Sequence, residues 1–324
     1  MKIVVLDGYS LNPGDLNWDR LNAIGETEIF DRTESRDIIS RSSGAEILLT
    51  NKTQLSAEVI DALPNLQFIG VLATGYNVVD TEAAAKREIP VCNIPTYGTQ
   101  SVAQMVFAHI LNFCHHVQNH SDRVKEGKWT KSPDFCFWDY PMQELAGKKL
   151  GIIGFGRIGQ KTADIGEAFG MQILGYDAYK SDQSNRSDFK WVELDELFSQ
   201  SDFISLHCPL FDETKGLINS KNLRKMKNTA FLVNTSRGPL IVEEDLSEAL
   251  EKGIIAGAGL DVLVSEPPIS ENPTPLLTTE KCIITPHISW ATKAARTRLM
   301  DMAVDNIIAF QNGSIQNDVT GKGR

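Results

Sequence analysis

Short apolar runs recur along the first hundred residues, with helical stretches between them. The four candidate strands are rich in Ile, Val and Leu and are bounded by Gly, Pro or Asn: Lys2–Leu6, Glu46–Thr50, Leu66–Leu72 and Ile89–Asn93. Segments such as Ser56–Ala62 and Asp80–Arg87 have a helical period. Continuous apolar strands that alternate with helices indicate a parallel sheet covered on both faces.

The same alternation begins again near Lys148. Six further strand candidates follow it: Lys149–Gly154, Met171–Tyr176, Phe203–His207, Ala230–Asn234, Ile255–Asp261 and Cys282–Thr285. Six strands with helices between them is the number found in a dinucleotide-binding domain. The sequence therefore predicts an α/β protein with two parallel sheets.

A helix is predicted between the two sets of strands, over Ser101–Asn119, with Ser101 as its N-terminal cap. The aromatic segment Lys131–Tyr140 after it is predicted to be a loop. A last helix, Thr292–Phe310, follows the second set of strands. A chain that returns in this way predicts a discontinuous first domain, residues 1–98 plus 293–324, and a second domain over residues 99–292.

Length and charge restrict the class of protein. A chain of 324 residues is long enough for two domains, and its net charge of -10 argues against nucleic acid or an anionic membrane as a partner. An anionic substrate would then need individual arginines in the site. The five cysteines form no CxxC pair, so we expect free thiols. The N-terminus lacks the long apolar run of a signal peptide, so we expect a cytoplasmic protein.

A glycine-rich turn carries the main argument for a cofactor. Gly154, Gly156 and Gly159 form G-x-G-x-x-G between a predicted strand and a predicted helix. In such a turn the glycines allow a tight bend, close approach of the backbone to a diphosphate, and close packing of the helix on the strand. The diphosphate meets free N–H groups at the helix start, around Arg157 and Ile158.

An acid at the end of the next strand sets the cofactor preference. Asp177 follows Gly159 by 18 residues (177 − 159), the spacing at which a carboxylate binds the ribose hydroxyls. It would repel a 2′-phosphate, so NAD(H) is favoured over NADP(H). Lys180 and Arg186 lie near the expected adenosine end and leave the NADP(H) alternative open.

Three polar residues follow the last three predicted strands. Arg237 lies in NTSRGP, Glu266 in DVLVSEPP and His287 in PHISWAT, so all three should emerge at the carboxyl edge of the sheet, where such sheets bind ligands. Reduction of a 2-keto acid needs a cation for the carboxylate and carbonyl, and Arg offers a planar fork. It also needs a proton donor, which suits His beside a carboxylate that favours the imidazolium.

On these motifs the chain resembles the D-isomer-specific 2-hydroxyacid dehydrogenases over nearly its whole length. The segments that carry the resemblance are GFGRIG with Asp177, HCPL at His207–Leu210, NTSRGP, GLDV at Gly259–Val262, SEPP and PHISWAT. Four further features are most similar to the bacterial glycerate dehydrogenases, also called hydroxypyruvate reductases: Ala73–Asp80, Tyr97–Gln104, Phe135–Pro141 and Trp290.

The resemblance implies a Rossmann NAD domain and a flavodoxin-like substrate domain, both doubly wound, with a cleft between them. It implies that Arg237 binds the substrate and that Glu266 partners His287, the general acid/base. It further implies substrate contacts at Ala73, Thr74 and Gly75, and cofactor contacts at Pro209, Thr235 and Asp261. A homodimer through Ser101–Asn119 and the aromatic loop is also implied, and no metal is expected.

Two departures argue against a phosphorylated substrate. Phosphoglycerate dehydrogenases of this family generally have a further C-terminal domain, whereas this chain ends at Arg324, and a basic residue where this chain has Gln100. Formate dehydrogenases have Gln in place of Glu266. The sequence therefore predicts reduction of hydroxypyruvate or glyoxylate, to D-glycerate or glycolate, by NADH.

Alternatives remain at this level. A D-lactate dehydrogenase or another 2-keto acid dehydrogenase would differ only in the shape of the pocket, and an NAD(H)-sensing corepressor could retain the same residues. The four histidines His109, His115, His116 and His120 could suggest a metal, because His116 and His120 are four residues apart. No acid or cysteine completes a ligand set nearby, so we interpret them as a polar helix flank.

Overall fold

The computed structural model describes residues 1–271 and 273–321. The chain divides into two compact units, unit 1 (Met1–Gly98 with Trp290–Arg324) and unit 2 (Thr99–Ser289). The second boundary thus lies at Trp290, whereas the sequence pattern predicted it at Lys293. Residues 322–324 of the predicted first domain lie outside the described residues.

Unit 1 contains a parallel sheet of five strands in the order β2-β1-β3-β4-β5. This is the strand order of a flavodoxin-like doubly wound fold, so the predicted fold of this part is confirmed. The strands are β1 (Lys2–Val5), β2 (Glu26–Ile29), β3 (Ile47–Thr50), β4 (Phe68–Val71) and β5 (Val91–Cys92).

Helices cover both faces of this sheet, and the alternation of side chains along a strand explains why. In β3, Ile47 and Leu49 join the core that includes residues of α11, and Leu48 joins the core on the opposite face. The helices of unit 1 are η1 (Gly8–Ser10), α1 (Asp19–Asn22), η2 (Ser35–Asp37), α2 (Ile38–Arg41), α3 (Ala57–Asp61), α4 (Thr81–Lys86) and α11 (Lys293–Gln311).

The strand β2 was not predicted from the sequence. Its residues, ETEI, pair in parallel with β1, but none of them is buried. An edge strand that is half exposed does not need an apolar run, so the criterion of Ile, Val and Leu content could not find it.

Unit 2 contains a parallel sheet of seven strands in the order β12-β11-β10-β9-β6-β7-β8. Read from β8, the first six positions follow the order of a Rossmann dinucleotide-binding fold, which confirms the predicted class. The strands are β6 (Lys149–Ile153), β7 (Gln172–Tyr176), β8 (Phe189–Trp191), β9 (Phe203–Leu206), β10 (Phe231–Asn234), β11 (Gly257–Leu260) and β12 (Cys282–Ile284).

The sheet of unit 2 also has a core on each face. In β6, Leu150 and Ile152 pack with Phe107 and Ile110 of α5, and Ile153 packs in the core on the other face. The helices of unit 2 are α5 (Thr99–His115), α6 (Val117–Lys125), α7 (Arg157–Ala168), α8 (Leu194–Gln200), α9 (Ser220–Leu223), η3 (Gly238–Leu240), α10 (Glu243–Glu251) and η4 (Pro275–Thr278).

Two predictions for unit 2 were wrong in detail. The strand β8 was missed because only three residues, FKW, form it at the sheet edge. The predicted helix Ser101–Asn119 is two helices, because His116 has a left-handed backbone (φ 46°) that ends α5 and precedes α6. The first of them begins at Thr99, two residues before the predicted cap Ser101.

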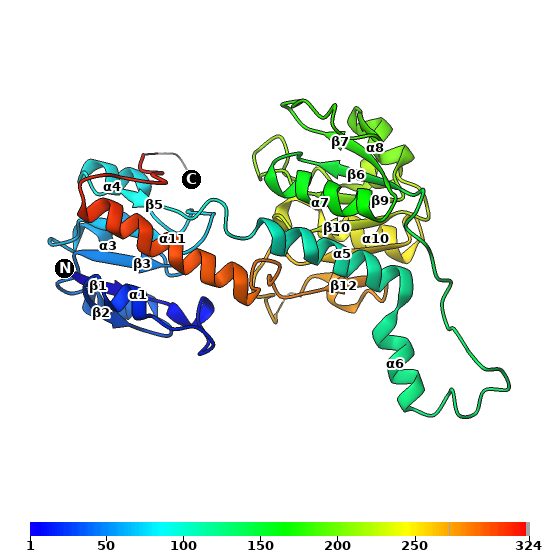
Figure 1. The fold of residues 1–324 in the computed structure, drawn as a ribbon, viewed down its shortest axis with the longest axis horizontal. Helices are drawn as coiled ribbons and strands as arrows, with labels where there is room; N and C mark the ends of the chain where they lie inside the picture. The colour runs from blue at the N-terminus through cyan, green and yellow to red at the C-terminus, as the bar shows by residue number, and fades with distance from the viewer. Residues whose placement is uncertain (272, 322–324) are drawn as a thin grey trace. The chain divides into compact units, whose positions relative to one another are not determined.

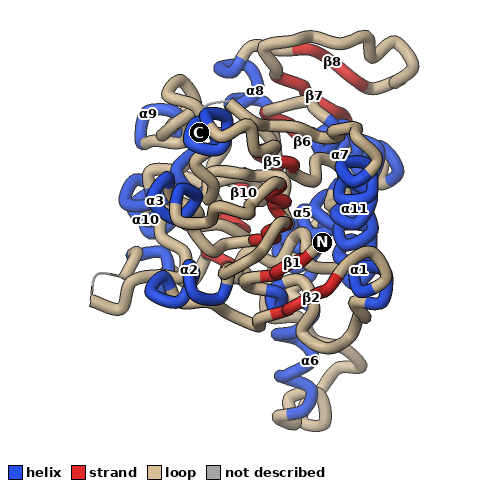
Figure 2. Tube along the Cα trace, turned by 90° about the vertical axis from the view of Figure 1, so that its left-hand side faces the viewer, coloured by secondary structure: helices blue, strands red, loops and turns tan. Residues whose placement is uncertain are grey.

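Residues from α6 to about Met142 form a segment that we call the arm, and it extends away from the rest of unit 2 (Figures 1 and 2). Contacts within the arm hold its loop. The indole N–H of Trp129 donates to the carbonyl of Phe135 at 2.8 Å, and Asp139 forms ion pairs with Arg123 and Lys128. Within residues 1–271 and 273–321, we find no helix with the length and apolarity of a membrane span.

Candidate active site

The turn after β6 requires glycine at two of the three positions of its glycine pattern. Gly154 has a left-handed backbone (φ +94°), and a Cβ there would lie 2.4 Å from the backbone nitrogen of Cys208. A Cβ on Gly159, in the first turn of α7, would lie 2.2 Å from the carbonyl oxygen of Gly154. A side chain fits at neither position, so the close crossing of strand and helix depends on both glycines.

Gly156 differs, because nothing within the described residues requires it to be glycine. Its φ of −74° suits any residue, and a Cβ there would have no described atom within 4 Å. Gly156 caps α7, a helix of twelve residues whose first N–H groups belong to Arg157 and Ile158. Open space in front of the start of a helix fits a diphosphate, which the backbone can approach only without a side chain.

Asp177 follows β7 and lies against this turn. One carboxylate oxygen, Oδ2, accepts the N–H of Phe155 at 2.6 Å, and Oδ1 accepts the N–H of Tyr179 at 3.0 Å. A carboxylate can accept about four hydrogen bonds, so these two leave capacity for a ligand. The side chain is half-buried and therefore accessible.

The two basic residues that could bind a 2′-phosphate are already paired. Lys180 lies 3.0 Å from Glu193. The side chain of Arg186 is 8% exposed and lies 2.6 Å from Asp164 and 2.5 Å from Glu167. Their charges are thus neutralised by carboxylates of unit 2.

Two polar atoms at the carboxyl ends of β9 and β10 make no hydrogen bond with the described residues. They are the hydroxyl of Thr235 and Nδ1 of His207, and both atoms are buried. Burial also lowers the pKa of His207 to about 3, so its imidazole is neutral. Buried polar groups are usually satisfied, so these two atoms fit a polar ligand such as NAD(H) beside the neighbouring residue Pro209.

Three neighbouring strands place the candidate catalytic residues. Arg237 follows β10, Glu266 follows β11 and His287 follows β12, and these strands are adjacent and parallel in the sheet. Their carboxyl ends therefore meet at one edge, as in other open α/β sheets that bind ligands there.

Glu266 and His287 form a direct pair. His287 Nδ1 lies 2.6 Å from Glu266 Oε2, and Glu266 Oε1 accepts the N–H of Leu263 at 2.9 Å. Because an ionised carboxylate only accepts, Nδ1 carries a proton and Nε2 is the ring atom that can exchange one. Both side chains are about one-third exposed, so the pair can reach a substrate.

The backbone of His287 is held in a conformation that few residues adopt. Its φ is +54°, in the left-handed region. The buried Asp261 holds this loop: its carbonyl accepts the N–H of His287 at 2.8 Å, and its carboxylate accepts the N–H groups of Ile288 and Ser289 at 2.9 and 2.7 Å. Asp261 thereby orients the imidazole.

A histidine outside the predicted site is linked to this loop. The hydroxyl of Thr285 donates to Asp261 Oδ1 at 2.5 Å and lies 3.3 Å from Nε2 of His109. Since the hydroxyl has one hydrogen, His109 must be the donor to Thr285. His109 is buried, and burial lowers its pKa, so interpreting it as part of a polar helix flank was wrong.

Arg237 is exposed and makes no ion pair with the described residues. Its Nη1 donates to the carbonyl of Ser236 at 2.8 Å. The turn that carries it is fixed by Asn234, whose side chain donates to the carbonyl of Arg237 at 2.8 Å and accepts from Ser236 at 3.0 Å. A guanidinium without a carboxylate partner is available for an anionic ligand.

Two residues that were not predicted from the sequence hold the Arg237 turn and the Glu266 loop together. A Cβ on Gly238 would lie 2.0 Å from the backbone of Leu263, so the two segments touch directly. Glu243, buried at the start of α10, accepts the N–H of Val264 at 2.7 Å. The sequence shows this acid a few residues after NTSRGP, but its partner Val264 lies 21 residues further along the chain.

In unit 1, the loop after β4 presents unsatisfied donors. The backbone N–H groups of Ala73, Thr74 and Gly75 have no acceptor among the described residues. The loop is held by Thr74, whose hydroxyl donates to the carbonyl of Ile94 at 2.7 Å, and by Asn93, which donates to the carbonyl of Thr74 at 2.7 Å. Successive free N–H groups of this kind bind anions.

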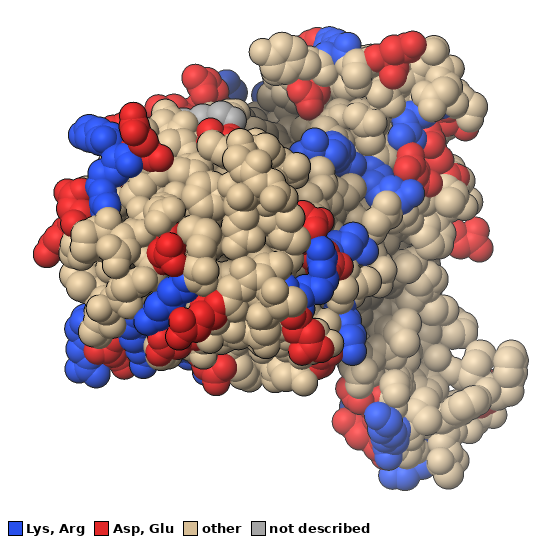
Figure 3. Space-filling view, turned by 60° about the vertical axis from the view of Figure 1, so that its left-hand side comes forward, with Lys and Arg blue, Asp and Glu red and all other residues tan. Residues whose placement is uncertain are grey.

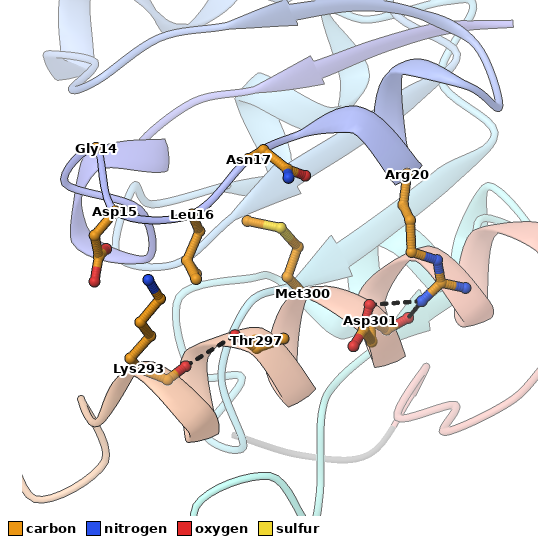
Figure 4. A pocket seen from close by; sticks show the side chains of 9 residues that line it. All are labelled: Gly14, Asp15, Leu16, Asn17, Arg20, Lys293, Thr297, Met300 and Asp301. Atoms are coloured by element: carbon orange, nitrogen blue, oxygen red, sulfur yellow. Dashed lines mark hydrogen bonds and ion pairs between the residues drawn. The ribbon is translucent and has the colours of Figure 1, made fainter.

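A pocket of about 470 Å³ lies elsewhere in unit 1, between the loop around Asp15 and α11 (Figure 4). Two of its charged side chains have partners: Arg20 lies 2.7 Å from Asp301, which also lines the pocket, and Asp15 lies 2.7 Å from Arg296. None of the predicted site residues lines it, so it has no part in the candidate active site.

Known proteins resemble this chain over nearly its full length. Hydroxypyruvate reductase of Blautia hydrogenotrophica is 56% identical over 98% of this chain and 99% of that protein. Glycerate dehydrogenase of Methylorubrum extorquens is 39% identical over 98% of each. The solved structure of D-lactate dehydrogenase from Aquifex aeolicus, complexed with NAD and lactic acid, is 28% identical, covers 100% of each chain and has a TM-score of 0.81.

The profile of the D-isomer specific 2-hydroxyacid dehydrogenase family, NAD binding domain, matches residues 107–289. These residues are more than half of the chain and nearly all of unit 2, so the predicted family and the predicted NAD-binding fold are both confirmed. The chain therefore belongs to the D-isomer-specific 2-hydroxyacid dehydrogenases, NAD-dependent oxidoreductases that act on 2-hydroxy acids.

Proposed function

We propose that this enzyme reduces hydroxypyruvate or glyoxylate with NADH, giving D-glycerate or glycolate. Two similar proteins, a hydroxypyruvate reductase and a glycerate dehydrogenase, support the substrate class. The observation that carries the chemistry is the 2.6 Å pair of Glu266 Oε2 with His287 Nδ1, and we assign proton transfer to the other ring nitrogen, Nε2.

In the proposed mechanism His287 is the general acid. NAD(H), when bound, supplies or accepts the hydride at C2 of the substrate. As the carbonyl oxygen gains negative charge, the imidazolium donates the Nε2 proton to it, and Glu266 stabilises the positive ring. Arg237 binds the carboxylate and polarises the carbonyl, because a planar guanidinium can hold both oxygens.

The remaining contacts follow the division of the chain. We assign substrate binding to unit 1, where the free N–H groups of Ala73, Thr74 and Gly75 receive the substrate carboxylate. We assign the cofactor to unit 2, with the diphosphate at Gly154–Gly159 and the nicotinamide near Thr235 and Pro209. Asp261 keeps one carboxylate oxygen with a single described donor, and we propose that it meets the carboxamide.

The proposed preference is for NADH over NADPH. Asp177 has acceptor capacity left for ribose hydroxyls, and its charge repels a 2′-phosphate. Lys180 and Arg186, which could have bound that phosphate, are paired with carboxylates instead. The local charge at this end of the site therefore favours a ribose without phosphate.

The decisive test replaces His287 with Asn. Asparagine adopts the left-handed backbone readily, and its amide can still donate to Glu266, so the loop should keep its shape. We expect kcat on hydroxypyruvate to fall by about a hundredfold to ten-thousandfold, the usual worth of a general acid, with NADH affinity retained. Undiminished turnover in this variant would exclude His287 as the proton donor.

A substrate panel tests the rest of the proposal. Hydroxypyruvate, glyoxylate and pyruvate are compared by kcat/KM with NADH and with NADPH. We expect the highest kcat/KM for hydroxypyruvate and glyoxylate with NADH. A higher kcat/KM for pyruvate would indicate a D-lactate dehydrogenase. Tight NADH binding without turnover on any acid would instead favour an NAD(H) sensor.

We further propose that the enzyme is a homodimer joined through the arm and α5. The arm exposes large apolar side chains, namely Val117, Trp129, Phe135, Trp138, Tyr140 and Met142. Much of the surface of the protruding end in Figure 3 carries no charged side chain. Exposed apolar groups in such density indicate an interface, and sedimentation equilibrium of the wild type and of Phe135→Ser tests it.

The five free cysteines support a reducing compartment, and we propose the cytoplasm.

A further inference from the structure

Helix α5 contacts the turn that carries His287 at two points. The hydroxyl of Ser101, near the start of α5, donates to the carbonyl of Ser289 at 2.5 Å. Two turns further along the helix, Nε2 of His109 lies 3.3 Å from the hydroxyl of Thr285. Both side chains of α5 are buried and lie on one face of the helix. The helix therefore holds this turn on each side of the imidazole of His287.

The imidazole of His109 lies directly against the backbone of β11. A Cβ on Gly259 would lie 2.8 Å from Cβ, Cγ and Nδ1 of His109, so the ring occupies the space that a side chain on the strand would need. Burial lowers the pKa of His109, so the ring is neutral and has a single N–H. That N–H is on Nε2, and it is used on Thr285. The missing side chain at Gly259 is thus what lets a donor on α5 reach the turn.

Thr285 connects this donor to the carboxylate of Asp261. Its hydroxyl donates to Asp261 Oδ1 at 2.5 Å, because a carboxylate only accepts. The same carboxylate accepts the backbone N–H groups of the two residues that follow His287, at 2.9 and 2.7 Å. The hydrogen bonds from His109 to Thr285 and from Thr285 to Asp261 therefore run in one direction and end at the backbone beside His287.

We propose that His109 is a positioning residue for proton transfer and acts through Thr285 and Asp261 on the turn that carries His287. This inference rests on the proposed function and adds to it a buried residue of α5. The backbone of His287 has a φ of +54°, a conformation that persists only where the surrounding contacts hold it. Without the N–H of His109 the hydroxyl of Thr285 can rotate, and its bond to Asp261 weakens. The imidazole of His287 then spends less time in the orientation for transfer, which lowers the rate.

The first experiment compares His109→Leu, which removes the N–H, with His109→Gln, whose amide can place an N–H near the position of Nε2. We expect kcat on hydroxypyruvate to fall about tenfold in His109→Leu, the usual worth of one hydrogen bond. KM should change by less than about twofold, because the loss falls on the transition state. His109→Gln should retain most of the wild-type kcat. The matched control is His115→Leu, the same substitution at the last residue of α5, which should leave kcat unchanged.

A double-mutant cycle separates positioning through Thr285 from a general effect of His109 on packing. Thr285→Val removes the hydroxyl and should by itself lower kcat by about tenfold. If His109 acts through that hydroxyl, adding His109→Leu to Thr285→Val should cause no further loss. Two losses that multiply in the double variant would overturn the proposal, as would a wild-type kcat in His109→Leu.

Hydrogen exchange tests the same link without turnover. The amides of Ile288 and Ser289 donate to Asp261, so their exchange in the enzyme without substrate should be faster in His109→Leu and remain slow in His109→Gln and His115→Leu. Unaltered exchange in His109→Leu would overturn the proposal even if kcat fell. Equal turnover of the wild type and His287→Asn would instead reject the proposed function, and the exchange result would still decide whether His109 holds the turn.

Discussion

An aspartate lies at the carboxyl edge of each sheet, and the two differ in burial and in the number of backbone N–H groups that they accept. In unit 1, Asp7 follows β1, is buried and accepts three backbone N–H groups. In unit 2, Asp177 follows β7, is half-buried and accepts two. Both strands belong to doubly wound parallel sheets, and both aspartates hold a neighbouring turn.

The difference is the acceptor capacity that remains. The carboxylate of Asp7 accepts three backbone N–H groups of residues 51–53 and is buried, so its role is to fix the turn at Lys52. Asp177 keeps acceptor capacity and exposure for a ligand. An aspartate at the end of a strand is therefore a candidate binding residue only when the backbone N–H groups around it leave some of its acceptor sites unfilled.

Of the substitutions at these two aspartates and the turns beside them, removal of Asp7 should have the largest effect on stability. Asp7→Ala leaves three backbone N–H groups without an acceptor in a largely buried turn, and we expect a loss of about 3 kcal/mol in the free energy of unfolding. Chemical denaturation measures it. Asp177→Ala serves as the matched control and should cost less than half as much, because its turn is more exposed. Equal costs would contradict the comparison.

A side chain at Gly156 should weaken cofactor binding with only a small effect on stability. Gly156→Val has a permitted backbone and no described atom near its Cβ, so the melting temperature should fall by only a few degrees, the cost of a poorer N-cap for α7. The dissociation constant for NADH should rise by about a hundredfold, or about 2.7 kcal/mol, because the side chain fills the space for the diphosphate. Gly154→Val, in contrast, should destabilise unit 2. Quenching of protein fluorescence by NADH measures the binding. An unaltered affinity for NADH would show that the diphosphate does not bind at this turn.

Neutralising Asp177 should change cofactor selectivity by a smaller factor. Asp177→Asn keeps an acceptor for the backbone of Phe155 but loses the negative charge. We expect the ratio of kcat/KM for NADH to that for NADPH to fall by about tenfold. Asp7→Asn is the control and should leave the ratio unaltered, even if stability falls. A ratio that stays constant in Asp177→Asn would place the ribose elsewhere.

Acid should act on unit 2 alone through its histidines, since all six lie in that unit. Burial lowers the pKa of His207 from its usual 6.5 to about 3, so the unfolded chain binds more protons than the folded one between these values. Stability is therefore lost as the pH falls below 6.5, by about 1 kcal/mol between about pH 7 and about pH 5.5 for this residue. Burial of His109 acts in the same direction.

The measurement is the free energy of unfolding as a function of pH for the wild type and for His207→Asn. The variant should show a flatter dependence below pH 6.5. The same slope in both proteins would remove His207 as the cause.

Most of the fold could be predicted from the sequence because both sheets are parallel and buried. Their central strands, such as β3 and β9, are continuous apolar runs, and the glycine turn after β6 identifies the class of unit 2. The edge strands β2 (ETEI) and β8 (FKW) were not predicted, because a strand that pairs along one side only needs little apolar surface. The break at His116 carried no Gly or Pro signal at all.

The candidate site divides in the same way. Arg237, Glu266 and His287 could be placed at one edge because each follows a strand. The supporting contacts could not, since they join residues distant in the chain: Glu243 with Val264, His109 with Thr285, and Asp7 with Lys52. Hydrogen bonds between residues so far apart in the sequence leave no periodic pattern, so only the folded chain reveals them.

The absence of a side chain at Gly238 has a consequence for how this site can evolve. Because the backbone of the Arg237 turn lies directly against that of Leu263 and Val264, neither segment can gain a residue or a bulky neighbour without moving the other. Under the proposed roles of Arg237 and Glu266, substitutions that alter binding of the acid will therefore also shift the carboxylate that pairs with His287. Affinity and turnover are thus expected to vary together among descendants of this sequence, and compensating substitutions should occur in pairs across the two segments.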